Sequence, residues 1–188
     1  AEIISADSMQ VYRYMDIGTA KPTISQRQEI RHYLIDIVNP DDVWTVADFI
    51  NQAEAHILDI KNRNKTPLIV GGTGLYLNSL INGYDFPIAS KNDEIRNRLS
   101  KLTEDELYLK LSNIDPDSSN KINRNDKKRM MRALEVFELT GMPISKLQKK
   151  NEPDKNTIEL ICLNMDRDKL YKRINERVDN MLKLGLID

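Results

Sequence analysis

Short apolar runs separated by longer amphipathic stretches characterise the first part of the chain. Three such runs, each bounded by polar or turn-forming residues, lie at residues 3–6, 33–38 and 67–70. Runs of this length and composition predict buried strands, and buried strands that alternate with helices belong to parallel sheets. We therefore expect an α/β fold built on a parallel sheet.

Helical spacing of apolar residues predicts the elements between these strands. Residues 23–31 are polar and predict a short exposed helix. A longer helix is expected to begin after Thr45, which forms a capping box with Asp48. Its apolar face recurs at helical spacing and consists of Val46, Ile50, Ala53, Ile57 and Ile60. A third helix is expected from Leu75.

The composition changes after Gly83. Residues 92–150 are rich in Lys, Glu, Asn and Leu, have a helical period and contain no credible strand. Thr103 and Glu106 form a capping box at the start of one helix. Another helix is expected from about Asp126 to Thr140, where Gly141 ends it. These features predict a helical insertion in the α/β fold.

The chain is expected to return to the sheet after this insertion. The apolar run at residues 158–163 predicts a strand, in which Cys162 would be a small core residue. A final helix from about Asp168 has one apolar face, made of Leu170, Ile174, Val178 and Met181. The expected domains are an α/β core over residues 1–83 and 153–188 and a helical insertion over residues 84–152.

Composition narrows the class of protein. The chain has 188 residues, 40% hydrophobic and 30% charged, which is typical of a soluble globular protein. Its net charge of −1 means that any contact with nucleic acid must come from a local cluster of basic residues. The single cysteine excludes an intrachain disulfide and a cysteine-built zinc site. No transmembrane stretch or signal peptide is visible, so we expect a cytoplasmic protein, and the abrupt ends indicate a fragment.

Two candidate sites for chemistry follow predicted strands. Asp7 comes directly after the first strand, and ligands of open α/β sheets bind beyond the carboxyl ends of the strands. A turn former or helix cap is the alternative role for such a residue. The glycine turn at residues 71–74 lies between a strand and a helix, where backbone N–H groups can approach an anion. A tight turn alone also requires glycine, so both interpretations remain. His32 is interpreted as a packed or capping residue.

A basic cluster lies in the predicted insertion. It consists of Lys121, Arg124, Lys127, Lys128, Arg129 and Arg132. On the helix from Asp126, Met130 would face the core, whereas Lys128 and Arg132 would point outward together. Such a cluster can hold a phosphate backbone, although a charged run is also typical of a solvated helix face.

Six stretches of the chain, taken together, resemble the tRNA dimethylallyltransferases. The matching stretches are residues 7–12, 16–22, 32–36, 71–76, 125–136 and 170–178. The resemblance covers nearly the whole chain, and its motifs are independent of one another. It implies a P-loop-NTPase-like core and transfer of a dimethylallyl group from dimethylallyl diphosphate. The acceptor would be N6 of the adenosine on the 3′ side of the anticodon, in tRNAs that read codons beginning with U.

The resemblance also implies roles for single residues. Asp7 would be the general base, and Thr73 would act beside it in the catalytic site. The implied contacts with the tRNA anticodon stem-loop are Asp7, Ser8, Met9, Gln10, Thr73, Arg96, Lys128, Arg129, Met130, Met131 and Arg132. Mg²⁺ is the implied cofactor, without any named metal ligand in this chain. We expect a monomer that does not bind membranes.

The chain departs from the family pattern at several places. No G-x-x-x-x-G-K-[ST] loop is present, so the residues that would hold the diphosphate cannot be assigned, and this chain alone is expected to be inactive. Asn123 and Arg124 stand where a His-Pro pair is common. The alternative functions are an adenylate isopentenyltransferase acting on free nucleotides, a P-loop small-molecule kinase, and a non-catalytic RNA-binding module.

Overall fold

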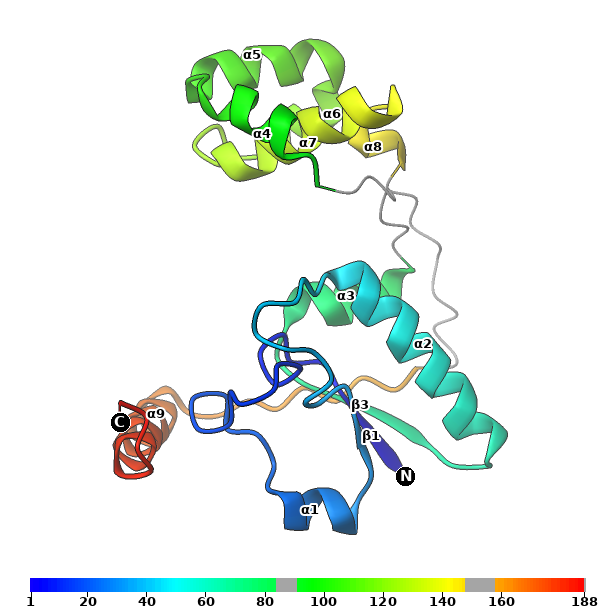
Figure 1. Cartoon of the computed structure of the whole chain (residues 1–188), viewed down its shortest axis with the longest axis vertical. Helices are drawn as coiled ribbons and strands as arrows, with labels where there is room; N and C mark the ends of the chain where they lie inside the picture. The colour runs from blue at the N-terminus through cyan, green and yellow to red at the C-terminus, as the bar shows by residue number, and fades with distance from the viewer. Residues whose placement is uncertain (84–90, 148–157, 188) are drawn as a thin grey trace. The chain divides into compact units, whose positions relative to one another are not determined.

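The computed structural model describes residues 1–83, 91–147 and 158–187 of the chain (Figure 1). Its contacts divide the chain into two compact units. Unit 1 comprises Ala1–Ile81 and Asp154–Asp188, and unit 2 comprises Asn82–Pro153. Among the described residues, no helix is both long and apolar enough to span a membrane.

Unit 1 is built on a small parallel sheet. Its described strands are β1 (Glu2–Ser5), β2 (His32–Tyr33) and β3 (Pro67–Val70), in the order β2-β1-β3. β1 pairs with β3 along its whole length, from Glu2 opposite Pro67 to Ser5 opposite Val70. The carboxyl ends of β1 and β3 therefore lie side by side. The first and third predicted strands are confirmed.

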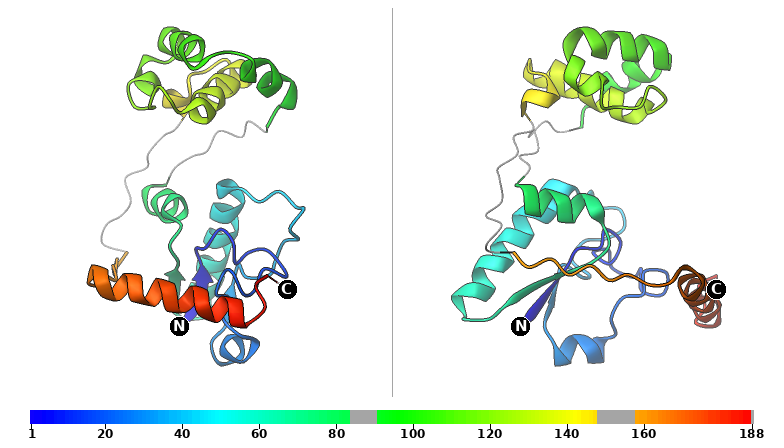
Figure 2. Two further views of the ribbon diagram at one scale, coloured as in Figure 1. Left: turned by 90° about the vertical axis from the view of Figure 1, so that its left-hand side faces the viewer. Right: turned by 180° about the vertical axis from the view of Figure 1, so that it is seen from behind.

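Three helices follow one another in the first part of unit 1, and the second and third of them contribute buried residues to its core (Figures 1 and 2). They are α1 (Ile24–Glu29), α2 (Val46–Asn62) and α3 (Gly74–Asn82). The capping box of Thr45 and Asp48 is present at the start of α2. α2 packs on β1 and β3, and the ring of its Phe49 stacks on Tyr76 of α3. The predicted helix face omitted Phe49, which is almost fully buried.

The second strand is shorter than predicted. β2 ends at Tyr33 because Leu34 and Asp36 have φ angles of 61° and 58°, outside the β region. The chain then bends toward the segment that follows β1. There the N–H groups of Asp36 and Ile37 donate to the carbonyls of Gln10 and Val11 at 3.2 and 2.9 Å. A strand over residues 33–38 is therefore wrong beyond its first residue, and the remainder is a loop joined to the Asp7 segment.

The predicted return strand is wrong. Residues 158–166 form no strand, and Leu160 and Leu163 are 71% and 93% exposed. Cys162 is exposed and is not a core residue. Apolar side chains favour a buried strand, but a strand also needs a neighbour for its backbone hydrogen bonds. Residues 158–163 pair with no other described strand. They lead as an extended trace to α9 (Arg167–Lys183) (Figure 2). The apolar side chains Leu170, Ile174 and Val178 of α9 are exposed.

Unit 2 is a bundle of helices, and no strand occurs in the part of it that is described. The helices are α4 (Asp93–Ser100), α5 (Glu104–Ile114), α6 (Pro116–Ser119), α7 (Lys127–Thr140) and α8 (Ile144–Leu147). The capping box of Thr103 and Glu106 begins α5, and Gly141, with φ 71°, ends α7. Its core contains Leu99, Leu107, Leu111, Met130, Ala133 and Leu134. The helical elements predicted here are confirmed.

Candidate functional site

Asp7 and Thr73 follow adjacent strands, and the structure brings their segments into direct contact. The N–H of Thr73 donates to the carbonyl of Ala6 at 3.2 Å. The N–H of Ser8 donates to Thr73 Oγ1 at 3.0 Å, and the Thr73 hydroxyl lies 3.3 Å from Ser8 Oγ. The acid segment and the glycine turn therefore form one edge of unit 1, at the carboxyl ends of β1 and β3.

The glycines of this turn differ in what they require. A Cβ at Gly71 would lie 2.4 Å from the backbone C and O atoms of Ala6, so only glycine fits there. A Cβ at Gly72 or Gly74 would meet no atom within 4 Å. Close packing explains Gly71, whereas the open space at Gly72 and Gly74 leaves their backbone accessible to a ligand.

The carboxylate of Asp7 shapes a turn with one oxygen. Asp7 Oδ1 accepts the N–H groups of Met9 and Gln10 at 2.8 and 3.2 Å. Asp7 Oδ2 has no hydrogen-bond partner among the residues that the structure describes. Asp7 therefore has the turn-forming role that was one of its two expected roles. Its second oxygen is left to accept a proton, as the other role requires.

A cavity of about 720 Å³ adjoins Asp7. The loop at residues 14–19 lines much of it, and Arg177 and Leu186 from the C-terminal segment complete the lining. The cavity is therefore lined by a carboxylate and a guanidinium. The carboxylate can accept a proton, and the guanidinium can bind an anion. Met9, at its rim, is 44% exposed.

Gln10 joins the Asp7 segment to the next loop. Its Nε2 donates to the carbonyls of Thr19 and Ala20 at 3.2 and 3.5 Å, and its Oε1 accepts from the Ser5 hydroxyl at 3.2 Å. These bonds engage the whole carboxamide within the chain. Gln10 therefore holds the loop at residues 14–20 against the strand end.

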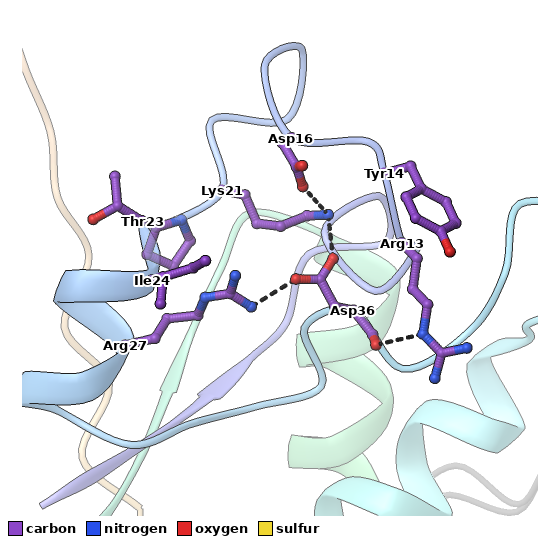
Figure 3. Close-up of a pocket in the computed structure, with 9 residues that line it drawn as sticks. Arg13, Tyr14, Asp16, Lys21, Thr23, Ile24, Arg27 and Asp36 are labelled. Atoms are coloured by element: carbon purple, nitrogen blue, oxygen red, sulfur yellow. Dashed lines mark hydrogen bonds and ion pairs between the residues drawn. The ribbon is translucent and has the colours of Figure 1, made fainter.

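A buried ammonium fastens the same loop (Figure 3). The Lys21 side chain is 2% exposed, and its Nζ donates to Tyr12 O, Asp16 Oδ1 and Asp36 Oδ1 at 2.7, 2.8 and 2.6 Å. Arg27 Nη1 binds the other oxygen of Asp36 at 2.6 Å. Burial alone would raise the pKa of Asp36, but the bonds from Lys21 and Arg27 hold that pKa below its usual value. This ion network borders a cavity of about 480 Å³.

The remaining predicted contact residues lie in unit 2. On α7, Lys128 and Arg129 are exposed, Met131 and Arg132 are half-buried, and Met130 is fully buried in the core. Arg96 lies on α4 and forms a bidentate ion pair with Glu135 of α7, with N–O distances of 2.8 and 3.0 Å. Arg132 Nη1 binds the same carboxylate at 2.9 Å.

Glu135 has a strongly perturbed pKa. Burial alone would raise it, but hydrogen bonds from Arg96, the Asn92 N–H and Arg132 lower it to about 2. Glu135 is therefore ionised at neutral pH although its side chain is completely buried.

Sequence reasoning omitted Arg177, Lys21 and Glu135 from the candidate residues. Glu135 could have been found as an acidic residue among the apolar positions of a helix face, with Arg132 one turn before it. Lys21 and Arg177 both lie in stretches that resemble the family, at residues 16–22 and 170–178, and this was the signal that could have singled them out.

Comparison with known proteins extends over the whole chain. The IPP transferase family model matches residues 10–188. The tRNA dimethylallyltransferase of Thermoanaerobacter sp. is 49% identical over 196 residues, which cover 100% of this chain and 62% of the relative. That of Acetivibrio thermocellus is 48% identical over 193 residues, 99% of this chain and 61% of the relative. The chain thus spans about three fifths of the length of the curated relatives it matches.

Solved structures give the same family. The full-length tRNA isopentenylpyrophosphate transferase of Bacillus halodurans is 41% identical with a TM-score of 0.62, covering 100% of this chain and 59% of that one. A eukaryotic dimethylallyltransferase described as acting on tRNA is 30% identical with a TM-score of 0.80, covering 98% of this chain and 47% of that one. The α/β fold with a parallel sheet is therefore that of tRNA isopentenyltransferases, and the chain belongs to the IPP transferase family.

Proposed function

We propose that the protein transfers a dimethylallyl group from dimethylallyl diphosphate to N6 of the adenosine on the 3′ side of the anticodon, in tRNAs that read codons beginning with U. The observation that supports this most is the position of Asp7. Its Oδ2 has no partner among the described residues, and it borders a cavity beside the Thr73 turn, in a chain of this family.

Asp7 is proposed as the general base. An exocyclic adenine amine is a weak nucleophile, and it becomes stronger as a carboxylate takes its proton during attack. Oδ1 is held by the N–H groups of Met9 and Gln10, so the carboxylate has a fixed orientation and Oδ2 is the oxygen that receives the proton. Thr73 keeps the Ser8 backbone in place and thereby the turn that presents Asp7.

The diphosphate leaving group needs positive charge around it. The guanidinium of Arg177 lines the Asp7 cavity and is proposed to contact the diphosphate, together with backbone N–H groups near the open space at Gly72 and Gly74. Ordered contacts of this kind hold the reacting carbon in line with the adenine amine.

Mg²⁺ is the proposed cofactor. The described residues contain no group of three or more side chains suited to a metal ion. Mg²⁺ is commonly held by one or two carboxylates together with water and substrate phosphate oxygens. Asp16 lines the same cavity as Asp7 and is the carboxylate proposed to contact the ion, whereas Asp7 Oδ2 receives the proton. A bound Mg²⁺ would neutralise charge on the departing diphosphate.

Recognition of tRNA is proposed to use residues of both units. Met9 lines the cavity, and Ser8, next to it in the chain, is bonded to Thr73, whereas Gln10 is bonded to the carbonyl of Thr19. In unit 2, Lys128 and Arg129 present exposed charges suited to phosphates. The fully buried side chain of Met130 supports α7 from within, whereas Met131, Arg132 and Arg96 are partly accessible. The target adenosine must leave its stack to reach Asp7.

Several alternatives are less well supported. The named relatives act on tRNA, which disfavours a free adenine nucleotide or a small-molecule kinase substrate. A non-catalytic RNA-binding module would not need an unbonded carboxylate oxygen at a cavity. We propose a monomeric cytoplasmic protein that acts without a membrane.

The test of this function uses the full-length protein with dimethylallyl diphosphate, Mg²⁺ and a synthetic anticodon stem-loop. Mass spectrometry of the digested RNA should find one added dimethylallyl group, on the adenosine 3′ to the anticodon. The control stem-loop has guanosine at that position and should remain unmodified. Modification of free adenosine monophosphate but not of the stem-loop would contradict the proposal.

A further inference from the structure

Glu135 lies at the junction of α4 and α7 and is surrounded by hydrogen-bond donors. Its Oε1 accepts from the Asn92 N–H and from Arg96 Nε, at 2.9 and 2.8 Å. Its Oε2 accepts from Arg96 Nη2 and Arg132 Nη1, at 3.0 and 2.9 Å. A carboxylate can accept about four hydrogen bonds, so Glu135 is saturated and fully buried.

This arrangement gives the two guanidiniums fixed positions. Arg96 uses Nε and Nη2 toward Glu135, and its Nη1 has no hydrogen-bond partner in the part of the chain that is described. The side chains of Arg96 and Arg132 are 36% and 33% exposed, so both reach the surface from their buried anchor. Two guanidiniums therefore share one buried carboxylate.

A second pair across the same two helices provides a contrast. Arg98 on α4 binds Glu138 on α7, but the Arg98 side chain is 65% exposed and Glu138 is 33% exposed. This pair is one cation and one anion, and it is open to solvent. Ion pairs of this kind hold their side chains weakly. The structure therefore contains two guanidiniums anchored on a fully buried carboxylate, beside an ion pair that is open to solvent.

We propose that Glu135 is a positioning residue, which holds Arg96 and Arg132 as a preformed pair for a backbone phosphate of the RNA. The proposal rests on the tRNA function proposed above and deepens it. The fork formed by Nε and Nη2 of Arg96 is held by Glu135, so Nη1 is the donor group that Arg96 offers to a phosphate. A donor whose position is fixed in advance loses less freedom when the phosphate arrives. The Glu135 carboxylate thereby favours phosphate binding by fixing the arginine side chains before the phosphate arrives.

The direction in which one substitution changes the affinity for RNA separates this proposal from simple charge repulsion. Glu135→Gln removes a buried negative charge from beneath the proposed phosphate contact, so charge repulsion alone predicts tighter RNA binding. A glutamine offers fewer acceptors and adds two donors, so at least two of the four donors around it lose their partner. Positioning therefore predicts weaker binding. Glu138→Gln removes the same charge one turn away and is the matched control.

The experiment measures binding of the anticodon stem-loop by the full-length protein over a range of salt concentrations, together with prenyl transfer. We expect Glu135→Gln to raise Kd and KM for the stem-loop about tenfold, to leave kcat unchanged at saturating RNA, and to reduce the salt slope by about one. Glu138→Gln should bind as tightly as the wild type, or more tightly. Equal or tighter binding by Glu135→Gln would overturn the proposal.

A second pair of variants serves if Glu135→Gln does not fold, as judged by circular dichroism. Arg96→Lys and Arg98→Lys both keep their charge on α4, but only the first breaks the bidentate bond to Glu135. We expect a several-fold weaker Kd for Arg96→Lys alone, and equal effects would contradict the proposal. If the wild type neither binds nor modifies the stem-loop, the proposed function fails. If it does both and the variants show no difference, only the role of Glu135 fails.

Discussion

Gly71→Ala should damage unit 1 at the point where the Asp7 and Thr73 segments meet. A Cβ at this position would lie 2.4 Å from Ala6 C and O and 2.8 Å from Ala6 Cα. These are backbone atoms, so no side-chain rotation can relieve the contact. The distance from the new Cβ to these Ala6 atoms would have to grow from 2.4 Å to at least the 3.4 Å of ordinary van der Waals contact. The two segments would therefore move apart by about 1 Å.

The size of the effect follows from what that displacement breaks. The Ala6 N–H donates to Val70 O at 2.8 Å, and the Thr73 N–H donates to Ala6 O at 3.2 Å. Losing both bonds costs about 1 kcal/mol each, and overpacking adds about 1–3 kcal/mol. We expect a loss of at least about 3 kcal/mol in the free energy of unfolding. Asp7 would also move by about 1 Å relative to Thr73, which can lower kcat about 100-fold.

Urea unfolding followed by circular dichroism measures this loss. With a denaturant slope of about 2 kcal/mol/M, the midpoint should fall by at least about 1.5 M. Gly72→Ala is the control, because its Cβ would meet nothing within 4 Å. Its stability should be unchanged or higher by about 0.4–1 kcal/mol. Equal midpoints for the two variants would refute the packing argument.

Two further predictions concern buried charges. The pKa of Glu135 is lowered from 4.5 to about 2, so its stabilisation is present above about pH 4.5 and is lost as the pH falls toward 2. The shift in the pKa corresponds to about 3 kcal/mol. The difference in unfolding free energy between wild type and Glu135→Gln should therefore shrink as the pH falls from 4.5 toward 2. A difference that stays constant over this range would contradict the prediction. Lys21→Met should destabilise the protein by about 2 kcal/mol, since it leaves Asp36 without its buried partner. The double variant Lys21→Met/Asp36→Asn should recover part of this loss in urea unfolding, and purely additive losses would show that the two side chains are not coupled.

Local sequence signals predicted the elements that depend on local interactions. The capping boxes at Thr45 and Thr103 and the glycine at 141 mark helix ends through bonds within a few residues, and the structure has all three. The first and third strands were predicted because both are apolar and lie between clear turns. The rule that parallel strands end at one edge of the sheet explains why the segments after the first and third strands meet, where Thr73 binds Ala6 and Ser8.

Elements that depend on distant partners were not predictable in this way. The second strand is short because Asp36 adopts a positive φ while bonded to Lys21 and to Gln10 O. The apolar run at residues 158–163 lacks a described neighbouring strand, which its composition could not reveal. Glu135 is buried because donors from α4 meet it, and Arg96 is 39 positions away in the sequence.

Asp7→Asn in the full-length protein tests the central claim most directly. The asparagine Oδ1 can still accept the N–H groups of Met9 and Gln10, so the turn is kept while the proton acceptor is lost. We predict that kcat for prenyl transfer to the anticodon stem-loop falls about 10²–10⁴-fold, with Kd for that RNA within about twofold of the wild type. Turnover by Asp7→Asn at the wild-type rate would contradict the assignment of Asp7 as the base.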